Sequence, residues 1–205
     1  LLDGVGPIHI NLQFDEPLLP DGAYEWLDGI KVQQLTKPSR VAATITPTTR
    51  KNIVIVGHDR AGFSVERIEK LAKDLGAPIV AEDPLSFESA VAHSPIILSD
   101  ERARDALKPE LLVVIGRTTL SRSINSYISS APYVMVIDPR LETVDTARSA
   151  AETHHEIPNL TSPIPKDDNW FELWAKYESR AAQSLESLPE WCEARVAATI
   201  AQELE

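Results

Sequence analysis

The sequence of 205 residues contains very little cysteine and no long apolar run. Its single cysteine, Cys192, has no second thiol for an internal disulfide or a C-x-x-C metal site, which fits a reducing compartment such as the cytoplasm. No apolar segment approaches the roughly 18 residues of a membrane span, and the given sequence shows no basic-then-apolar leader. The chain begins with Leu1-Leu2 rather than Met. We therefore interpret it as an internal piece of a longer cytoplasmic protein.

Positive charge is also scarce. Lys and Arg together number 20 against 31 Asp and Glu, which leaves a formal net charge of −11. This excess of negative charge repels phosphate backbones, so general nucleic-acid binding is not expected. The length and the hydrophobic fraction of 43% suffice for one large domain with a buried core and no disulfide or metal staple. Composition thus excludes several classes of protein without choosing a function.

Four short apolar runs are typical of strands that are buried on both faces of a parallel sheet. They cover residues 52–57, 78–81, 111–116 and 133–138. Apolar residues at helical spacing separate the runs, with Ser64 and Asp100 as N-caps and Gly76 as a terminator. Residues 154–157 are a further candidate strand. We predict an α/β fold with a doubly wound, mostly parallel sheet of five to six strands.

The two ends of the chain differ from this regular middle. Residues 6–14 alternate apolar and polar side chains as a strand does, and residues 21–50 show no sustained period and are interpreted as a connector. Near the other end, Asp167 or Asp168 is placed to cap a helix. Two C-terminal helices are predicted from the apolar residues Trp170, Phe171, Trp174 and Tyr177, and from Trp191, Val196 and Ile200. We divide the chain into a central α/β domain, residues 1–165, and a C-terminal helical segment, residues 166–205.

The loop from Gly57 to Ser64 has the G-x-x-x-x-G frame of a phosphate-binding loop. Phe63 stands where such a loop requires the lysine that pairs with phosphate, and the G-x-G-x-x-G dinucleotide pattern is also missing. Its backbone amides could still form an anion-binding nest at the start of the next helix. The favoured interpretation is a plain turn, and the alternative is an anion- or nucleotide-binding module.

The loop from Gly116 to Arg122 carries two cations and several hydroxyls at the carboxyl end of a predicted strand. Open α/β sheets bind ligands at that edge. Arg117 and Arg122 oppose the positive end of the following helix, a conflict that a bound anion would relieve. We predict that Arg122, Arg117 and Ser121 bind a carboxylate or a phosphate. The alternative is that one arginine pairs with a nearby acid while the other faces solvent.

No other group of residues completes a catalytic or metal site. His154-His155 lacks partners at metal-ligand spacing, and Cys192 has no evident base. We therefore assign no catalytic residue and no metal ligand.

Three segments resemble one family of thiamine-diphosphate-dependent enzymes, the 2-succinyl-5-enolpyruvyl-6-hydroxy-3-cyclohexene-1-carboxylate synthases of menaquinone biosynthesis. Residues 6–20, GPIHINLQFDEPLLP, resemble the G-P-V-H-x-N-x-P-F-x-E-P-L motif that opens the family's central domain. Residues 78–86, PIVAEDPLS, resemble its P-V-x-A-E-P-x-S strand and loop. Residues 116–122, GRTTLSR, resemble its G-R-P-T-L-S-R motif, especially in actinobacterial forms, although Gln13 and Thr118 replace prolines in the first and third motifs.

The resemblance implies the Rossmann-like central domain of an enzyme that decarboxylates 2-oxoglutarate on thiamine diphosphate and adds the succinyl unit to isochorismate. In that family the cofactor and its magnesium are bound by pyrimidine- and diphosphate-binding domains, and the sequence has no G-D-G…N metal motif. The resemblance therefore implies an inactive fragment that binds no cofactor by itself. Its partners would be those two domains of the same parent chain, in a homo-oligomer, and its C-terminal helical segment would lead to the diphosphate-binding domain.

The central domain of this family is mainly structural, but one of its loops reaches the site of reaction. A basic residue on the loop that matches residues 116–122 extends toward the anionic substrate pocket. In some members arginines here help to bind a dihydroxynaphthoate inhibitor. The resemblance thus implies a substrate or effector contact for Arg122 first and for Arg117 second.

Overall fold

The chain divides into two units, Leu1–Arg40 and Val41–Glu205. The computed structural model describes residues 41–117, 119–140, 150–189 and 191–203, all of which lie in the second unit. The predicted strand at residues 6–14 and most of the predicted connector lie outside the described residues. The predicted boundary between residues 165 and 166 stays a prediction.

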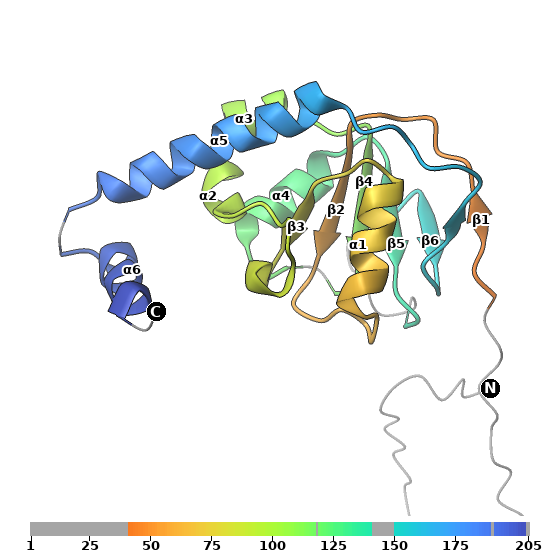
Figure 1. Cartoon of the computed structure of the whole chain (residues 1–205), viewed down its shortest axis with the longest axis horizontal. Helices are drawn as coiled ribbons and strands as arrows, with labels where there is room; N and C mark the ends of the chain where they lie inside the picture. Colours follow the sequence, from red (N-terminus) through yellow and green to blue (C-terminus); the bar gives the residue numbers. More distant parts are fainter. Residues whose placement is uncertain (1–40, 118, 141–149, 190, 204–205) are drawn as a thin grey trace, which may run out of the picture. The chain divides into compact units, whose positions relative to one another are not determined.

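Five strands form one parallel sheet in the order β3-β2-β4-β5-β6 (Figure 1). Their bounds are Asn52–Val56 for β2, Ile79–Ala81 for β3, Leu111–Ile115 for β4, Val134–Ile137 for β5 and Glu152–His154 for β6. The register pairs Val54 with Val113, and Val113 with Met135. The predicted α/β fold with a doubly wound parallel sheet is confirmed.

Helices α1 (Val65–Asp74), α2 (Ser94–Ile97), α3 (Glu101–Ala106), α4 (Arg122–Ser130) and α5 (Asp168–Glu186) cover the two faces of this sheet, with a short 3-10 helix at Pro84–Ser86. The last helix, α6 (Glu193–Glu203), contributes no described side chain to either core. Successive residues of β2 point to opposite faces, so Ile53 and Ile55 join the core under α2 to α5, whereas Val54 and Val56 join the core under α1. Figure 1 shows α1 in front of the sheet and α4 behind it.

Side-chain caps begin four of these helices, including each of those predicted from the sequence. In each case an oxygen of the N-cap side chain accepts a hydrogen bond from a backbone N–H two or three residues further on, which satisfies a donor that has no partner within the helix. The pairs are Ser64 with Arg67, Asp100 with Arg102, Ser121 with Ile124, and Asp167 with Trp170. None of the described helices is long and apolar enough to cross a membrane.

The long helix α5 is attached to the sheet by its tryptophans. Trp170 and Trp174 are both buried and meet edge to face, and Trp174 meets Tyr127 of α4 in the same way. The indole N–H of Trp170 donates to the carbonyl of Asn52 at 2.8 Å. The buried Asn52 side chain in turn donates to the Leu75 carbonyl at the end of α1 (2.7 Å). This chain of contacts joins the two helical layers through the sheet.

Two details of the prediction were wrong. Residues 44–45, inside the predicted connector, form strand β1, which pairs in parallel with β7 (Asn159–Leu160). Strands of two residues are too short to show a period of alternation. The last strand of the main sheet lies at residues 152–154 rather than 154–157, because the apolar signal came from Ile157, a core residue in the segment that follows the strand.

Candidate functional site

The order in which strands are added to the sheet reverses after β3, although all the strands stay parallel. β3 lies on one side of β2, whereas β4, the next strand in the sequence, lies on the other side of β2. The switch point of the sheet therefore lies between β2 and β4. The loops that leave these two strands therefore enter helices on opposite faces, α1 and α4. In open α/β sheets the crevice at such a switch point is the usual place for a ligand.

In this chain the backbones of the two loops fill the switch point. The Arg117 N–H donates to the Asp59 carbonyl at 3.3 Å. A Cβ added at Gly57 would lie 1.3 Å from the Arg117 carbonyl oxygen, and one added at Gly116 would lie 1.7 Å from that of Asp59. Gly116 also has φ +73°, in the left-handed region that favours glycine. The approach of the two loops therefore requires glycine at both positions.

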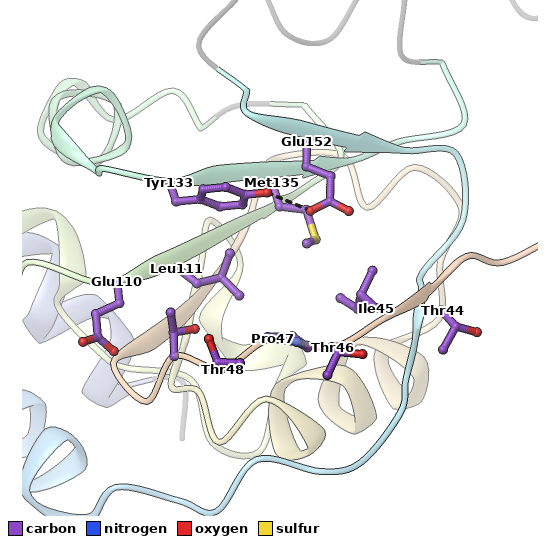
Figure 2. A pocket seen from close by; sticks show the side chains of 11 residues that line it. Thr44, Ile45, Thr46, Pro47, Thr48, Glu110, Leu111, Tyr133, Met135 and Glu152 are labelled. Atoms are coloured by element: carbon purple, nitrogen blue, oxygen red, sulfur yellow. Dashed lines mark hydrogen bonds between the residues drawn. The ribbon is translucent and has the colours of Figure 1, made fainter.

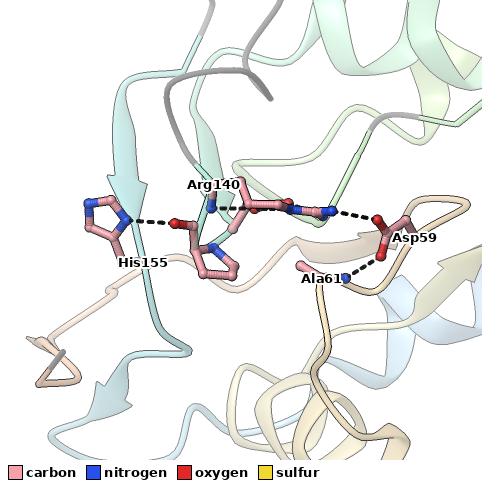
Figure 3. Close-up of polar contacts among 6 residues, drawn as sticks. Asp59, Ala61, Arg140 and His155 are labelled. Atoms are coloured by element: carbon pink, nitrogen blue, oxygen red, sulfur yellow. Dashed lines mark hydrogen bonds and ion pairs between the residues drawn. The ribbon is translucent and has the colours of Figure 1, made fainter. Parts of the chain in front are cut away.

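A charged cluster of Asp59, Asp138 and Arg140 joins the carboxyl ends of β2 and β5 (Figure 3). Arg140 holds Asp59 through Nη1 at 2.7 Å, and it holds Asp138 through Nη2 at 2.8 Å and Nε at 3.0 Å. The Asp138 side chain is fully buried, whereas those of Arg140 and Asp59 are 25% and 38% exposed. Asp59 also accepts from the Ala61 N–H at 2.8 Å.

These contacts shift the pKa values of Asp59 and Arg140 toward the charged forms. The hydrogen bond from Arg140, followed by that from the Ala61 amide, lowers the pKa of Asp59, and the charge of Arg117 adds to the effect. The hydrogen bonds to Asp138 and then to Asp59 raise the pKa of Arg140. Asp59 and Arg140 therefore both carry their charges near neutral pH.

Of the predicted site residues, Arg117 contacts this cluster through its backbone N–H. Arg117 directly follows Gly116, Ser121 caps α4 through the Ile124 N–H at 3.4 Å, and Arg122 is the first residue of that helix. Both arginines are exposed, and neither makes a salt bridge within the described part of the chain. Thr118 lies outside the described residues. Whether these arginines bind an anion stays a prediction.

Two of the three motifs that carry the resemblance meet at this edge of the sheet. Glu82, directly after β3, accepts from the Leu120 N–H through its Oε2 at 3.3 Å. The Asn125 side chain donates to the Thr119 carbonyl at 2.8 Å and holds the same loop from α4. The motif at residues 6–20 lies outside the described residues.

The Gly57–Ser64 loop has a structural reason for its departure from a phosphate-binding loop. Phe63, at the position of the missing lysine, is buried in the core under α1. The Ala61 amide is bound to the Asp59 carboxylate, and the Phe63 amide donates to the Arg60 carbonyl at 3.0 Å. A carboxylate thus lies where a nest would hold an anion. These contacts favour the plain-turn interpretation.

A pocket of about 520 Å³ lies at the opposite, amino edge of the sheet (Figure 2). Its lining contains two carboxylates and neither Lys nor Arg. Glu110 accepts from the Arg50 and Lys51 amides, which lowers its pKa. Glu152 accepts from the Tyr133 hydroxyl at 3.0 Å, and this contact raises the pKa of Tyr133. This pocket does not suit an anionic substrate, so the candidate site stays at the carboxyl edge.

The sequence reasoning missed Asp59, Asp138 and Arg140. One signal was present, because Asp138 interrupts an apolar run at the carboxyl end of a strand and an arginine follows two residues later. The partner, Asp59, lies 81 residues away from Arg140 in the sequence, and no local spacing connects them. Within the described ranges no group of three or more His, Cys, Asp or Glu side chains could hold a metal ion.

Residues 23–205 match the family model described as "Middle domain of thiamine pyrophosphate". The chain belongs to this middle-domain family.

Several curated relatives of this middle domain carry the name 2-succinyl-5-enolpyruvyl-6-hydroxy-3-cyclohexene-1-carboxylate synthase. The protein of Bacillus cytotoxicus is 24% identical over 88% of this chain and 36% of its own length. That of Geobacillus thermodenitrificans is 26% identical over 96% of this chain and 39% of its own. That of Thermobifida fusca is 27% identical over 80% and 31%. The chain thus spans about a third of the length of the relatives that it matches.

Proposed function

We propose that this chain is the central domain of a 2-succinyl-5-enolpyruvyl-6-hydroxy-3-cyclohexene-1-carboxylate synthase. The parent enzyme would decarboxylate 2-oxoglutarate and add the succinyl unit to isochorismate. The observation that carries the proposal is the loop at residues 116–122, which presents two exposed arginines at the carboxyl edge of the sheet. The names of the curated relatives support the same reaction.

Arg122 and Arg117 would act by charge pairing with a carboxylate of a substrate or effector. Both substrates of the proposed reaction are dicarboxylates, and a guanidinium forms paired hydrogen bonds with a carboxylate. The first turn of α4 contains no acidic residue, so its positive end adds to the attraction. In a chain with a net charge of −11, this local positive field would guide an anion to one edge of the sheet.

The same proposal assigns the cofactor to other parts of the parent protein. Thiamine diphosphate would supply the carbanion chemistry, and magnesium would hold its diphosphate. The described residues offer no acidic cluster for that metal, so we assign both groups to the pyrimidine- and diphosphate-binding domains of the parent chain. Those domains are the proposed partners of this one, in a homo-oligomer, and this chain alone would be inactive.

Alanine variants of Arg117 and Arg122 in the full-length protein test the proposal. We expect each to raise the KM for isochorismate or 2-oxoglutarate by about tenfold, since each removes one charge-assisted contact. Arg102, which is exposed on α3, provides a matched control, and Arg102→Ala should leave both KM values unchanged.

Two results would contradict the proposal in different ways. A full-length protein that forms no product from 2-oxoglutarate and isochorismate with thiamine diphosphate and Mg²⁺ would refute the assigned reaction. If the enzyme is active and the double variant without both arginines keeps the same KM values and the same sensitivity to a carboxylate effector, the reaction stands but the ligand contact is refuted. This domain would then be a structural spacer.

A further inference from the structure

The backbone that carries Arg117 is held by the charged cluster rather than by its own loop alone. The Arg117 amide is bound to the Asp59 carbonyl, and the Asp59 carboxylate is bound to Arg140 at 2.7 Å. Arg140 is fixed in turn by three hydrogen bonds to Asp138, two from its guanidinium and one from its own backbone N–H at 2.6 Å. The carboxyl ends of three adjacent strands, β4, β2 and β5, are thus connected in series.

The cluster has the features of a rigid support. Asp138 is fully buried, and a buried carboxylate is stable only when it is paired and hydrogen-bonded. Arg140 meets that need with a planar fork that engages both aspartates at once, which a lysine would not reproduce. The glycines at positions 57 and 116 allow the two loops to touch, and the Asp59–Arg140 pair holds them in that contact.

We infer that Asp59 and Arg140 form a positioning pair that sets the direction from which Arg117 meets an anionic ligand. This inference rests on the proposed function, in which Arg117 contacts a substrate or effector carboxylate. The pair itself does not touch the ligand. Its effect reaches the ligand through Arg117.

Asp59→Asn in the full-length protein is the most direct test. The substitution removes the charge that pairs with Arg140 but leaves the buried Asp138–Arg140 pair intact, so the domain keeps its fold. Glu156→Gln is the matched control, because it removes a carboxylate from an ion pair with Arg67 at 3.2 Å in which Asp59, Arg140 and Arg117 take no part. Arg140→Lys is the second variant, since it keeps the positive charge without the fork.

The first readout is amide hydrogen exchange, which does not depend on activity. We expect exchange across residues 116–121 to become about tenfold faster in Asp59→Asn, with no change there in Glu156→Gln. Arg140→Lys is expected to give an intermediate rate. Unchanged exchange in Asp59→Asn would overturn the inference.

The second readout is a kinetic double-mutant cycle with Arg117→Ala. Asp59→Asn alone should raise the KM for the anionic substrate by about fivefold with kcat nearly unchanged, and in the Arg117→Ala background it should change the KM by less than about twofold. Additive effects would show that Asp59 acts by another route and would overturn the inference. A third outcome is faster amide exchange in Asp59→Asn together with an unaltered KM in Arg117→Ala. That result would show that Asp59 holds the loop, and it would refute the ligand contact that the proposed function assigns to Arg117.

Discussion

Replacing Gly57 with alanine should destabilise this domain far more than an ordinary glycine substitution. The added Cβ would lie 1.3 Å from a backbone oxygen of Arg117, and no side-chain rotation relieves a clash with backbone. The β2 and β4 loops would have to separate, with loss of the Arg117–Asp59 backbone hydrogen bond at 3.3 Å. We expect a cost of at least about 3 kcal/mol.

Alanine variants of two other glycines distinguish the cost of the steric clash from the cost of a left-handed backbone. Gly62 has φ +82° and nothing within 4 Å of an added Cβ, so Gly62→Ala pays only for the left-handed backbone, about 1 kcal/mol. Gly116 combines φ +73° with a Cβ position 1.7 Å from the Asp59 carbonyl oxygen, and its alanine variant should cost about 4 kcal/mol or more. The expected order of destabilisation is therefore Gly62, Gly57, Gly116.

Thermal unfolding monitored by circular dichroism checks this order. For a chain of this size each kcal/mol lowers the melting temperature by about 2–4 °C, so Gly62→Ala should lose about 2–4 °C and Gly57→Ala about 6–12 °C. The double variant Gly57→Ala/Gly116→Ala should cost less than the sum of the two single variants, because both open the same contact. If Gly57→Ala melts at the same temperature as Gly62→Ala, the close contact between the two loops is refuted.

Further predictions concern the charged cluster and the core. Because the pKa of Asp59 is lowered from 3.8, its stabilising effect is complete above that value and is lost as the pH falls through the lowered pKa. Acid titration of the melting temperature should therefore show a steeper fall below about pH 4 for wild type than for Asp59→Asn, and parallel curves would contradict the assignment. Tyr127→Phe removes the hydrogen bond from the buried hydroxyl to the Leu107 carbonyl and should cost about 1–2 kcal/mol in urea unfolding; a variant as stable as wild type would show that this carbonyl finds another donor.

Most of the fold could be predicted because its signals are local. The continuous apolar runs of β2, β4 and β5 identify strands that are buried on both faces, and capping residues such as Ser64 mark where helices begin. Strand β1 was missed because it has only two residues and pairs with the distant strand β7. A hydrogen bond between Thr46 and Thr161, beside these two strands, joins residues 115 positions apart in the sequence. No periodicity within the sequence signals such a contact.

The candidate site was predicted only in part, for a related reason. The position of Arg117 and Arg122 follows from the rule that parallel strands present their carboxyl ends at one edge. The contact of Gly57 with Arg117 and the bond of Asp59 with Arg140 depend on how three strands are ordered within the sheet. That order is a tertiary property, and the spacing of residues in the sequence does not contain it.

The filled switch point also restricts how this domain can evolve. A nucleotide crevice between β2 and β4 would need space that the two loop backbones now occupy. A larger residue at Gly57 or Gly116 would push the loops apart and would break the backbone contact between them. Replacement of Asp59 or Arg140 alone would leave the other residue without its partner in their ion pair. Each single step toward an open crevice is therefore costly before any ligand can compensate. We expect these four positions to vary together or not at all among homologues, a pattern that an alignment of the family would reveal.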